Sequence, residues 1–110
     1  MPGPGFKISD LRTAVARGAI EWQCHALERM LERGIRQAEA VEVLLNGERI
    51  EDYPNDVPYP RALFLGWIGG RPLHVVAAYS TSRQTVYVIT AYEPSAAYFE
   101  DDFRTRKKRS

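Results

Sequence analysis

The stretch CHALERMLERGI, residues 24–35, decides the fold. At 100° per residue, Leu27, Met30 and Leu31 fall on one side of a helix, whereas the charged residues fall on the other side. Gly34 then ends the pattern, and glycine is common just after a helix C-terminus. The stretch therefore predicts an amphipathic helix of about three turns with one face in the core.

The polar face of this helix has two interpretations. His25 precedes Arg29 by one turn, and a neutral imidazole beside a fixed cation is unusual on a surface without a function. The alternative is a solvated face on which Glu28, Glu32 and the arginines form simple ion pairs along the helix. The charges alone favour this alternative.

The bulk composition predicts one soluble domain over residues 1–103. The chain has 110 residues, of which 45% are hydrophobic and 26% charged, and no apolar run is long enough to span a membrane. The Pro/Gly-rich N-terminus lacks the apolar core of a signal peptide, and the single Cys24 leaves no intrachain disulfide, so we expect a cytoplasmic protein. The net charge of +1 hides a basic tail at 104–110, which we expect to be disordered.

Helical periodicity occupies the first half of the chain and strand periodicity the second half. A short helix is expected between Ser9 and Gly18, since serine favours the N-cap and glycine ends helices. Gly69–Gly70 between two apolar runs predicts a hairpin. The other expected elements are helices at 24–33 and 37–46, an extended connector at 20–23, and strands at 49–53, 61–68, 73–79 and 85–93. This order predicts an α+β domain, with N-terminal helices packed on one face of a three- to four-stranded antiparallel sheet.

Two polar residues occupy unusual places in the expected strands. His74 lies inside an apolar strand, either as a core histidine bonded to a carbonyl or as an acid or base on the open sheet face. Tyr92 ends the last strand, where it either packs or presents its hydroxyl to a groove. Pairing Ser80 with Thr85 would place His74 and Tyr92 on opposite faces, whereas a one-residue shift or a bulge would place them on the same face.

The available side chains suit RNA cleavage through the 2′-hydroxyl. The sequence has no phosphate-binding glycine loop, CxxC pair, HExxH motif or serine nucleophile elbow. Histidines, arginines and tyrosines can remove the hydroxyl proton, stabilise the phosphorane and protonate the leaving oxygen without a metal or cofactor. A metal-dependent hydrolase using Cys24, His25 and His74 is a weaker alternative, because these ligands are few for a zinc site.

Several motifs together resemble one bacterial family, the domain-of-unknown-function 4258 family. They are HALERMLERGI at 25–35, LLNG at 44–47, IEDYP at 50–54, GRPLHVV at 70–76 and ITAYEP at 89–94. Members of that family resemble RelE/MqsR-like toxins of type II toxin–antitoxin systems, which are small mRNA endonucleases. The resemblance implies a RelE-like α+β fold, cleavage of free or ribosome-bound mRNA, and a cognate antitoxin of the MqsA zinc-finger type.

The resemblance also points to site residues. His25 or His74 is expected as acid or base, Arg29 and Arg33 as phosphate ligands, and Tyr92 as a positioning or proton-transfer group. Further RNA contacts are expected from Arg71 at the hairpin and from the tail residues Arg104, Arg106, Lys107, Lys108 and Arg109. The alternative function is a non-catalytic RNA- or protein-binding module on the same fold.

Overall fold

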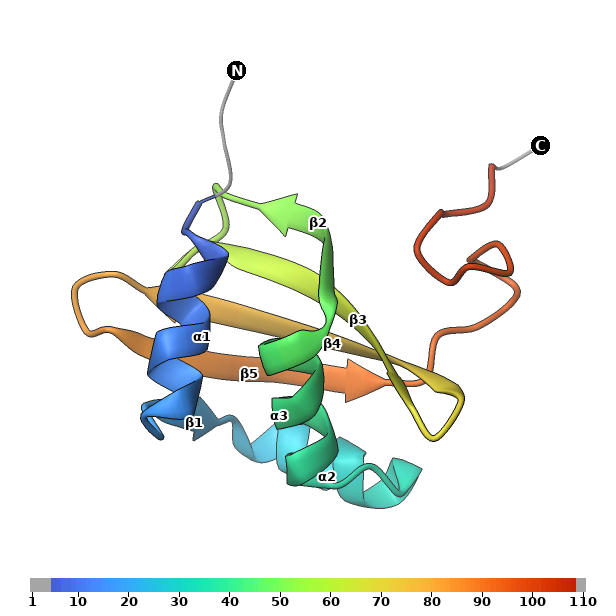
Figure 1. Cartoon of the computed structure of the whole chain (residues 1–110), viewed down its shortest axis with the longest axis horizontal. Helices are drawn as coiled ribbons and strands as arrows, with labels where there is room; N and C mark the ends of the chain where they lie inside the picture. Colours follow the sequence, from blue (N-terminus) through green and yellow to red (C-terminus); the bar gives the residue numbers. More distant parts are fainter. Residues whose placement is uncertain (1–4, 109–110) are drawn as a thin grey trace.

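The structure, a computed structural model, describes residues 5–108 as an α+β domain (Figure 1). This confirms the expected fold class. The helices are α1 (Ile8–Ala16), α2 (Cys24–Arg33) and α3 (Gln37–Asn46), and the strands are β1 (Ile20–Trp22), β2 (Glu48–Tyr53), β3 (Arg61–Ile68), β4 (Arg71–Ser80) and β5 (Thr85–Tyr92). The strand order in the sheet is β1-β5-β4-β3-β2. No helix among these residues is long and apolar enough to cross a membrane.

The sheet has five strands rather than the expected three or four, because the connector before α2 is itself a strand. β1 pairs in parallel with β5, with Ile20 opposite Val86 and Trp22 opposite Val88. Ile20 and Trp22 alternate with an exposed residue and pack against the core. A three-residue segment shows too little periodicity to be recognised from sequence, so the pattern indicates only a connector there.

α1 and α3 lie across one face of the sheet, and α2 packs against β5 at its edge (Figure 1). The main core lies between α1, α3 and the sheet. Gly66 of β3 allows α3 to approach closely, since a Cβ at this position would stand 2.7 Å from Cγ2 of Val43. The largest buried apolar side chains are Leu11, Met30, Val43, Leu44, Leu63, Phe64, Val75, Val86 and Val88.

α2 forms where it was expected, but it buries a different stripe. Ala26 and Met30 face the core, whereas Leu27 is 38% exposed and Leu31 is 82% exposed. The predicted apolar face of this helix was therefore wrong in part. α2 covers an edge of the sheet, so a narrow i,i+4 stripe is enough to bury it. Gly34 adopts a left-handed conformation with φ 68°, and it ends the helix as predicted.

A bulge in β5 decides which side chains share a face. Ser80 pairs with Thr85 as expected, but Ile89 is an extra residue in β5, so His74 lies opposite Tyr92. Directly opposed residues point to the same side of a sheet. A bulge was one of the alternatives that the sequence allowed. It brings His74 and Tyr92 together on the face turned away from α1 and α3.

The C-terminal segment, residues 95–108, folds back over that second face. The sequence suggests a disordered tail from residue 104, yet Phe99 and Arg106 form an antiparallel bridge. Arg104 pairs with Glu48, and Arg106 pairs with Glu51 of the same strand, β2. Composition shows the cations of this segment but not their distant partners. Lys107 and Lys108 are exposed, and Arg109 lies outside the described residues.

Candidate functional site

His74 is a fully buried histidine in the centre of the second face. Leu65, His74 and Tyr92 form one row across β3, β4 and β5. The ring of Phe99 packs edge-on against the imidazole with centroids 4.7 Å apart, and the ring of Tyr92 packs at 5.4 Å. Because Phe99 belongs to the C-terminal segment, that segment separates His74 from solvent.

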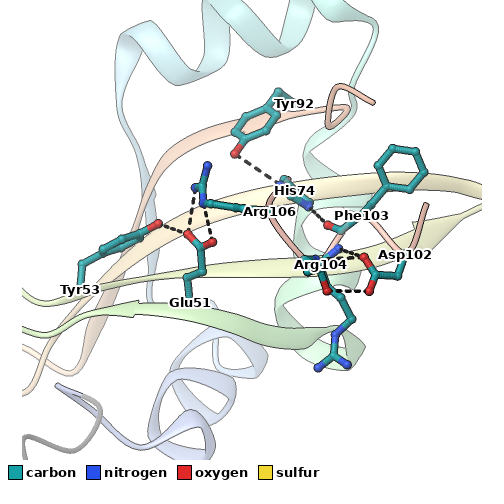
Figure 2. Close-up of polar contacts among 9 residues, drawn as sticks. Glu51, Tyr53, His74, Tyr92, Asp102, Phe103, Arg104 and Arg106 are labelled. Atoms are coloured by element: carbon teal, nitrogen blue, oxygen red, sulfur yellow. Dashed lines mark hydrogen bonds and ion pairs between the residues drawn. The ribbon is translucent and has the colours of Figure 1, made fainter. Parts of the chain in front are cut away.

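The hydrogen bonds of His74 define its tautomer (Figure 2). Nε2 lies 2.6 Å from the carbonyl oxygen of Phe103, and a carbonyl only accepts, so Nε2 carries the proton. Nδ1 then has a free lone pair 3.4 Å from the hydroxyl of Tyr92, which donates to it. Burial lowers the pKa of His74, although the Phe103 carbonyl and Glu51 oppose this shift. Burial raises the pKa of Tyr92, so both side chains are neutral at neutral pH.

A turn around Asp102 presents the Phe103 carbonyl to His74. The Asp102 carboxylate accepts the backbone N–H groups of Arg104 and Thr105 at 3.0 and 2.9 Å, and these bonds lower its pKa. Phe103 has a φ of 54°, which is uncommon for a residue with a side chain. This conformation is held by the Asp102 turn on one side and His74 on the other (Figure 2).

Glu51 fixes Arg106 over the sheet. The guanidinium of Arg106 donates to both carboxylate oxygens, at 2.6 and 2.9 Å, and the hydroxyl of Tyr53 donates to the same carboxylate. The hydrogen bond from Arg106 is the main reason that the pKa of Glu51 is lowered, and the same bond raises the pKa of Arg106 above its already high value. Arg106 also covers the ring of Phe99 at 4.9 Å. This network holds the C-terminal segment against β2.

A pocket of about 620 Å³ opens beside Tyr92 and is lined by three arginines. Arg33 comes from the end of α2, Arg71 from the start of β4 and Arg106 from the C-terminal segment. Arg33 donates to the carbonyl of Ala91 at 2.9 Å, which holds its guanidinium beside the last strand. We call this hollow the Tyr92 pocket. It combines a phenol, with His74 behind it, three arginines and two carboxylates, those of Glu39 and Glu93. The arginines are the groups that suit a phosphate.

The comparison with family models decides the family. The model described as "Domain of unknown function (DUF4258)" matches residues 22–93. The chain belongs to the DUF4258 family. The matched region contains Arg33, Arg71, His74 and Tyr92, whereas Arg106 lies beyond it. No curated protein matches the chain.

The DUF4258 region does not bring all the expected residues to the Tyr92 pocket. The side chain of His25 is 91% exposed and lies 3.8 Å from Glu28, and Arg29 lies 3.5 Å from Glu32. Neither His25 nor Arg29 lines the pocket. His25 precedes Arg33 by eight residues, about 12 Å along the helix. The structure therefore does not place the two histidines in one site, and Arg33 is the residue of α2 that reaches it.

Sequence reasoning missed the groups that surround His74. Glu51, Phe99 and Phe103 are not among the expected site residues, although Glu51 lies within the IEDYP motif. Glu51 and Tyr53 alternate on β2, which was a signal that both face one side of the sheet. Within residues 5–108, no three His, Cys, Asp or Glu side chains gather in a cluster of the kind that holds a metal, and Cys24 is exposed.

Proposed function

We propose that this protein is a metal-independent endoribonuclease that cleaves mRNA through the 2′-hydroxyl. The observation that supports this most directly is the convergence of Tyr92, Arg33, Arg71 and Arg106 on one pocket, with His74 bonded to the tyrosine. Cleavage of this kind needs a proton acceptor beside the 2′-hydroxyl and fixed positive charge beside the phosphate. Both are within the Tyr92 pocket.

Tyr92 and His74 supply the proton transfer. The phenol oxygen of Tyr92 accepts the proton of the 2′-hydroxyl while the phenol passes its own proton to Nδ1 of His74. The 2′-oxygen then attacks the phosphorus, and the bond to the 5′-oxygen breaks. The proton returns from His74 through Tyr92 to that leaving oxygen, so the pair acts first as base and then as acid. The negative charge of Glu51 opposes the lowering of the His74 pKa by burial, and it therefore favours the transient imidazolium.

The three arginines bind the phosphate and stabilise the charge of the phosphorane. Arg33 and Arg106 are held by the Ala91 carbonyl and by Glu51, so their positions are set before RNA binds. Arg71 lies 3.8 Å from Glu93 and its side chain is exposed, which suits a contact to a neighbouring phosphate. Preorganised donors of this kind contribute about 10²–10³-fold in rate.

The second candidate is a binding module that holds RNA or a protein without cleaving it. The observation that favours it is the burial of His74, whose ring nitrogens are both engaged by groups of the protein. The two functions differ in one respect that can be measured. The binding module retains RNA in the Tyr92 pocket without product, whereas the nuclease releases fragments.

Removal of one hydroxyl tests the nuclease proposal. Tyr92→Phe keeps the ring against His74 but removes the proton acceptor, so single-turnover cleavage of a short mRNA should fall by about 10²–10⁴-fold. Tyr98→Phe is the matched control, because Tyr98 also lines the pocket but its hydroxyl is not a hydrogen-bond partner of His74. Absence of cleavage by the wild-type protein would support the binding module. Equal cleavage rates for Tyr92→Phe and the wild-type protein would show that the Tyr92 hydroxyl takes no part in the proton transfer.

The cellular role that follows is that of a toxin in a type II toxin–antitoxin system. Such a protein acts in the cytoplasm on free or ribosome-bound mRNA and is held inactive by an antitoxin, for which a zinc-finger protein of the MqsA type is our candidate. Expression without the antitoxin should arrest growth, and Tyr92→Phe should relieve the arrest. Growth arrest that persists in Tyr92→Phe at equal expression would contradict the link between cleavage and toxicity.

A further inference from the structure

A second pocket, of about 330 Å³, lies on the same face of the sheet as His74. Arg61, Ala78 and Tyr87 form a row across β3, β4 and β5, and all three line this pocket. The pairing of β3 with β4 is regular, so Ala78 and His74 point to the same side. They are four residues apart on β4, which corresponds to about 13 Å.

An aromatic wall forms one side of this pocket. Tyr59 stacks on Tyr87 with ring centroids 5.2 Å apart and planes inclined by 10°. Pro58 and Pro60 flank Tyr59 and restrict the backbone that carries it. Both rings are half-buried. A flat ring held in this way offers a stacking surface for any nucleic-acid base.

Two arginines stand beside the aromatic wall. Nε of Arg61 is buried without a hydrogen-bond partner, and Arg61 forms an ion pair with Asp56, whose Oδ2 lies 3.6 Å from Nε. Arg83 is exposed in the turn between β4 and β5, and no carboxylate of the described residues pairs with it. The pocket therefore combines an aromatic surface with positive charge, the pattern by which proteins hold single-stranded nucleic acid.

We infer that this hollow, the Tyr59 pocket of Tyr59, Arg61, Arg83 and Tyr87, binds a base and phosphate of the same single-stranded RNA that enters the Tyr92 pocket. The inference rests on the proposed function, because it takes RNA as the substrate. The base stacks on Tyr59, and Arg61 and Arg83 contact the adjacent phosphate. An acidic peptide would use the arginines but would gain little from a flat tyrosine ring, so RNA is the better match.

The test uses an RNA that binds but cannot be cleaved. A 5′-labelled 2′-O-methyl RNA dodecamer is titrated with the full chain, and binding is measured by fluorescence anisotropy at several salt concentrations. Tyr59→Ala should weaken binding by roughly 5- to 150-fold, the usual loss for one stacked base. Tyr59→Phe keeps the stacking surface and should bind within about twofold of the wild-type protein.

A charge variant tests the phosphate contact separately. Arg83→Ala should reduce the slope of log affinity against log salt by about 0.7, the value for one phosphate on a single strand. Arg29→Ala removes an exposed arginine outside both pockets and is the matched control, with an unchanged slope.

The two proposals fail in different ways. Tight binding by Tyr59→Ala, or an unchanged slope for Arg83→Ala, would overturn the Tyr59 subsite whatever the cleavage result. Failure of the wild-type protein to bind the dodecamer would overturn it as well. Loss of binding in both Tyr59→Ala and Tyr59→Phe, with an unchanged melting temperature, would also contradict stacking. If the wild-type protein binds this RNA but does not cleave the unmodified RNA, the Tyr59 subsite is supported and the proposed nuclease activity is contradicted.

Discussion

The sequence predicts phosphate contacts both from α2 and from the basic tail at 104–110, whose described residues belong to the C-terminal segment, residues 95–108. Their charges are used differently. In α2, His25 and Arg29 pair with glutamates three residues away and remain on the surface. In the C-terminal segment, Arg106 pairs with Glu51, 55 residues earlier in the chain, and helps to line the Tyr92 pocket. Arg29 pairs with a carboxylate three residues away in the same helix, whereas Arg106 pairs with a distant carboxylate and so holds the C-terminal segment against β2.

The two kinds of pair also differ in what they stabilise. Exposed pairs within a helix contribute about 0.3–0.5 kcal/mol, because solvent screens them and both side chains lose entropy. The pair of Arg106 with Glu51 has two parallel hydrogen bonds, and the carboxylate is only 21% exposed, although the arginine side chain is 54% exposed. Charged hydrogen bonds of this geometry contribute more, about 1.5–3 kcal/mol. Arg106 of the basic tail therefore lines the Tyr92 pocket, as does Arg33 at the end of α2, whereas His25 and Arg29 of α2 do not.

The largest expected difference lies within α2 itself. Arg33→Ala should lower the single-turnover cleavage rate by about 10²–10³-fold, since it removes a preorganised donor from the Tyr92 pocket. His25→Ala and Arg29→Ala should stay within about twofold, because neither side chain lines the pocket. If His25→Ala lowered the cleavage rate as much as Arg33→Ala does, the active site would have to include the exposed face of α2 that carries His25.

The next effect concerns stability. Arg106→Ala leaves the Glu51 carboxylate without its main partner and should reduce the free energy of unfolding by about 1–3 kcal/mol, measured by urea denaturation. Arg29→Ala should change it by less than about 0.5 kcal/mol. Equal losses in the two variants would mean that the C-terminal segment is held no more firmly than a surface ion pair.

A pH titration of stability separates His74 from Glu51. Burial lowers the pKa of His74 in the folded state, so the unfolded chain binds more protons as pH falls through the ordinary histidine value of about 6.5. The free energy of unfolding should therefore decline below pH ~6.5, and His74→Gln should remove that part of the decline. Glu51, whose pKa is also lowered, should add a second decline only below its usual value of 4.5.

The matched control for that titration is His25→Gln, which changes an exposed histidine. Its pH profile should keep the same decline as the wild-type protein. A decline that disappears in His25→Gln and persists in His74→Gln would contradict the buried, neutral state of His74.

The smallest effect is expected at the end of the tail. Truncation after Lys107 removes Lys108, Arg109 and Ser110 but retains the bond from the Lys107 amide to the Tyr98 carbonyl. The unfolding free energy should be unchanged, and the slope of log RNA affinity against log salt should fall by about 0.7 for each phosphate that these cations neutralise. Reduced stability in this truncation would show that the last cations also hold the fold.

Much of the fold was predictable because its signals are local. The helix ending at Gly34, the Gly69–Gly70 hairpin and the pairing of Ser80 with Thr85 all follow from turn chemistry and periodicity. The bulge at Ile89 was not predictable. Pairing β5 with β4 with or without an extra residue leaves an apolar pattern on β5 in either case. Only the packing of the folded sheet decides between the two registers.

The site was harder to predict than the fold, because its contacts join distant parts of the chain. His74 and Tyr92 were recognised as candidates, but Glu51 and Arg106 are brought together only by the folding of the C-terminal segment over β2. Phe99 and the apolar residues near it were the one local signal that this segment packs rather than staying free. Exposed charges on α2 carried no such signal, and their local pairing is the alternative that the charge pattern favoured.

The most direct test of metal-independent cleavage through the 2′-hydroxyl compares one RNA with and without the reacting hydroxyl. A short mRNA and copies with single 2′-deoxy substitutions are incubated with the full chain in the presence of EDTA, and the product ends are analysed by mass spectrometry. The proposed mechanism predicts cleavage that persists in EDTA, yields 2′,3′-cyclic phosphate ends and stops when the hydroxyl beside the cleaved phosphate is absent. Cleavage that continues at the deoxy position, or that requires a divalent metal, would contradict it.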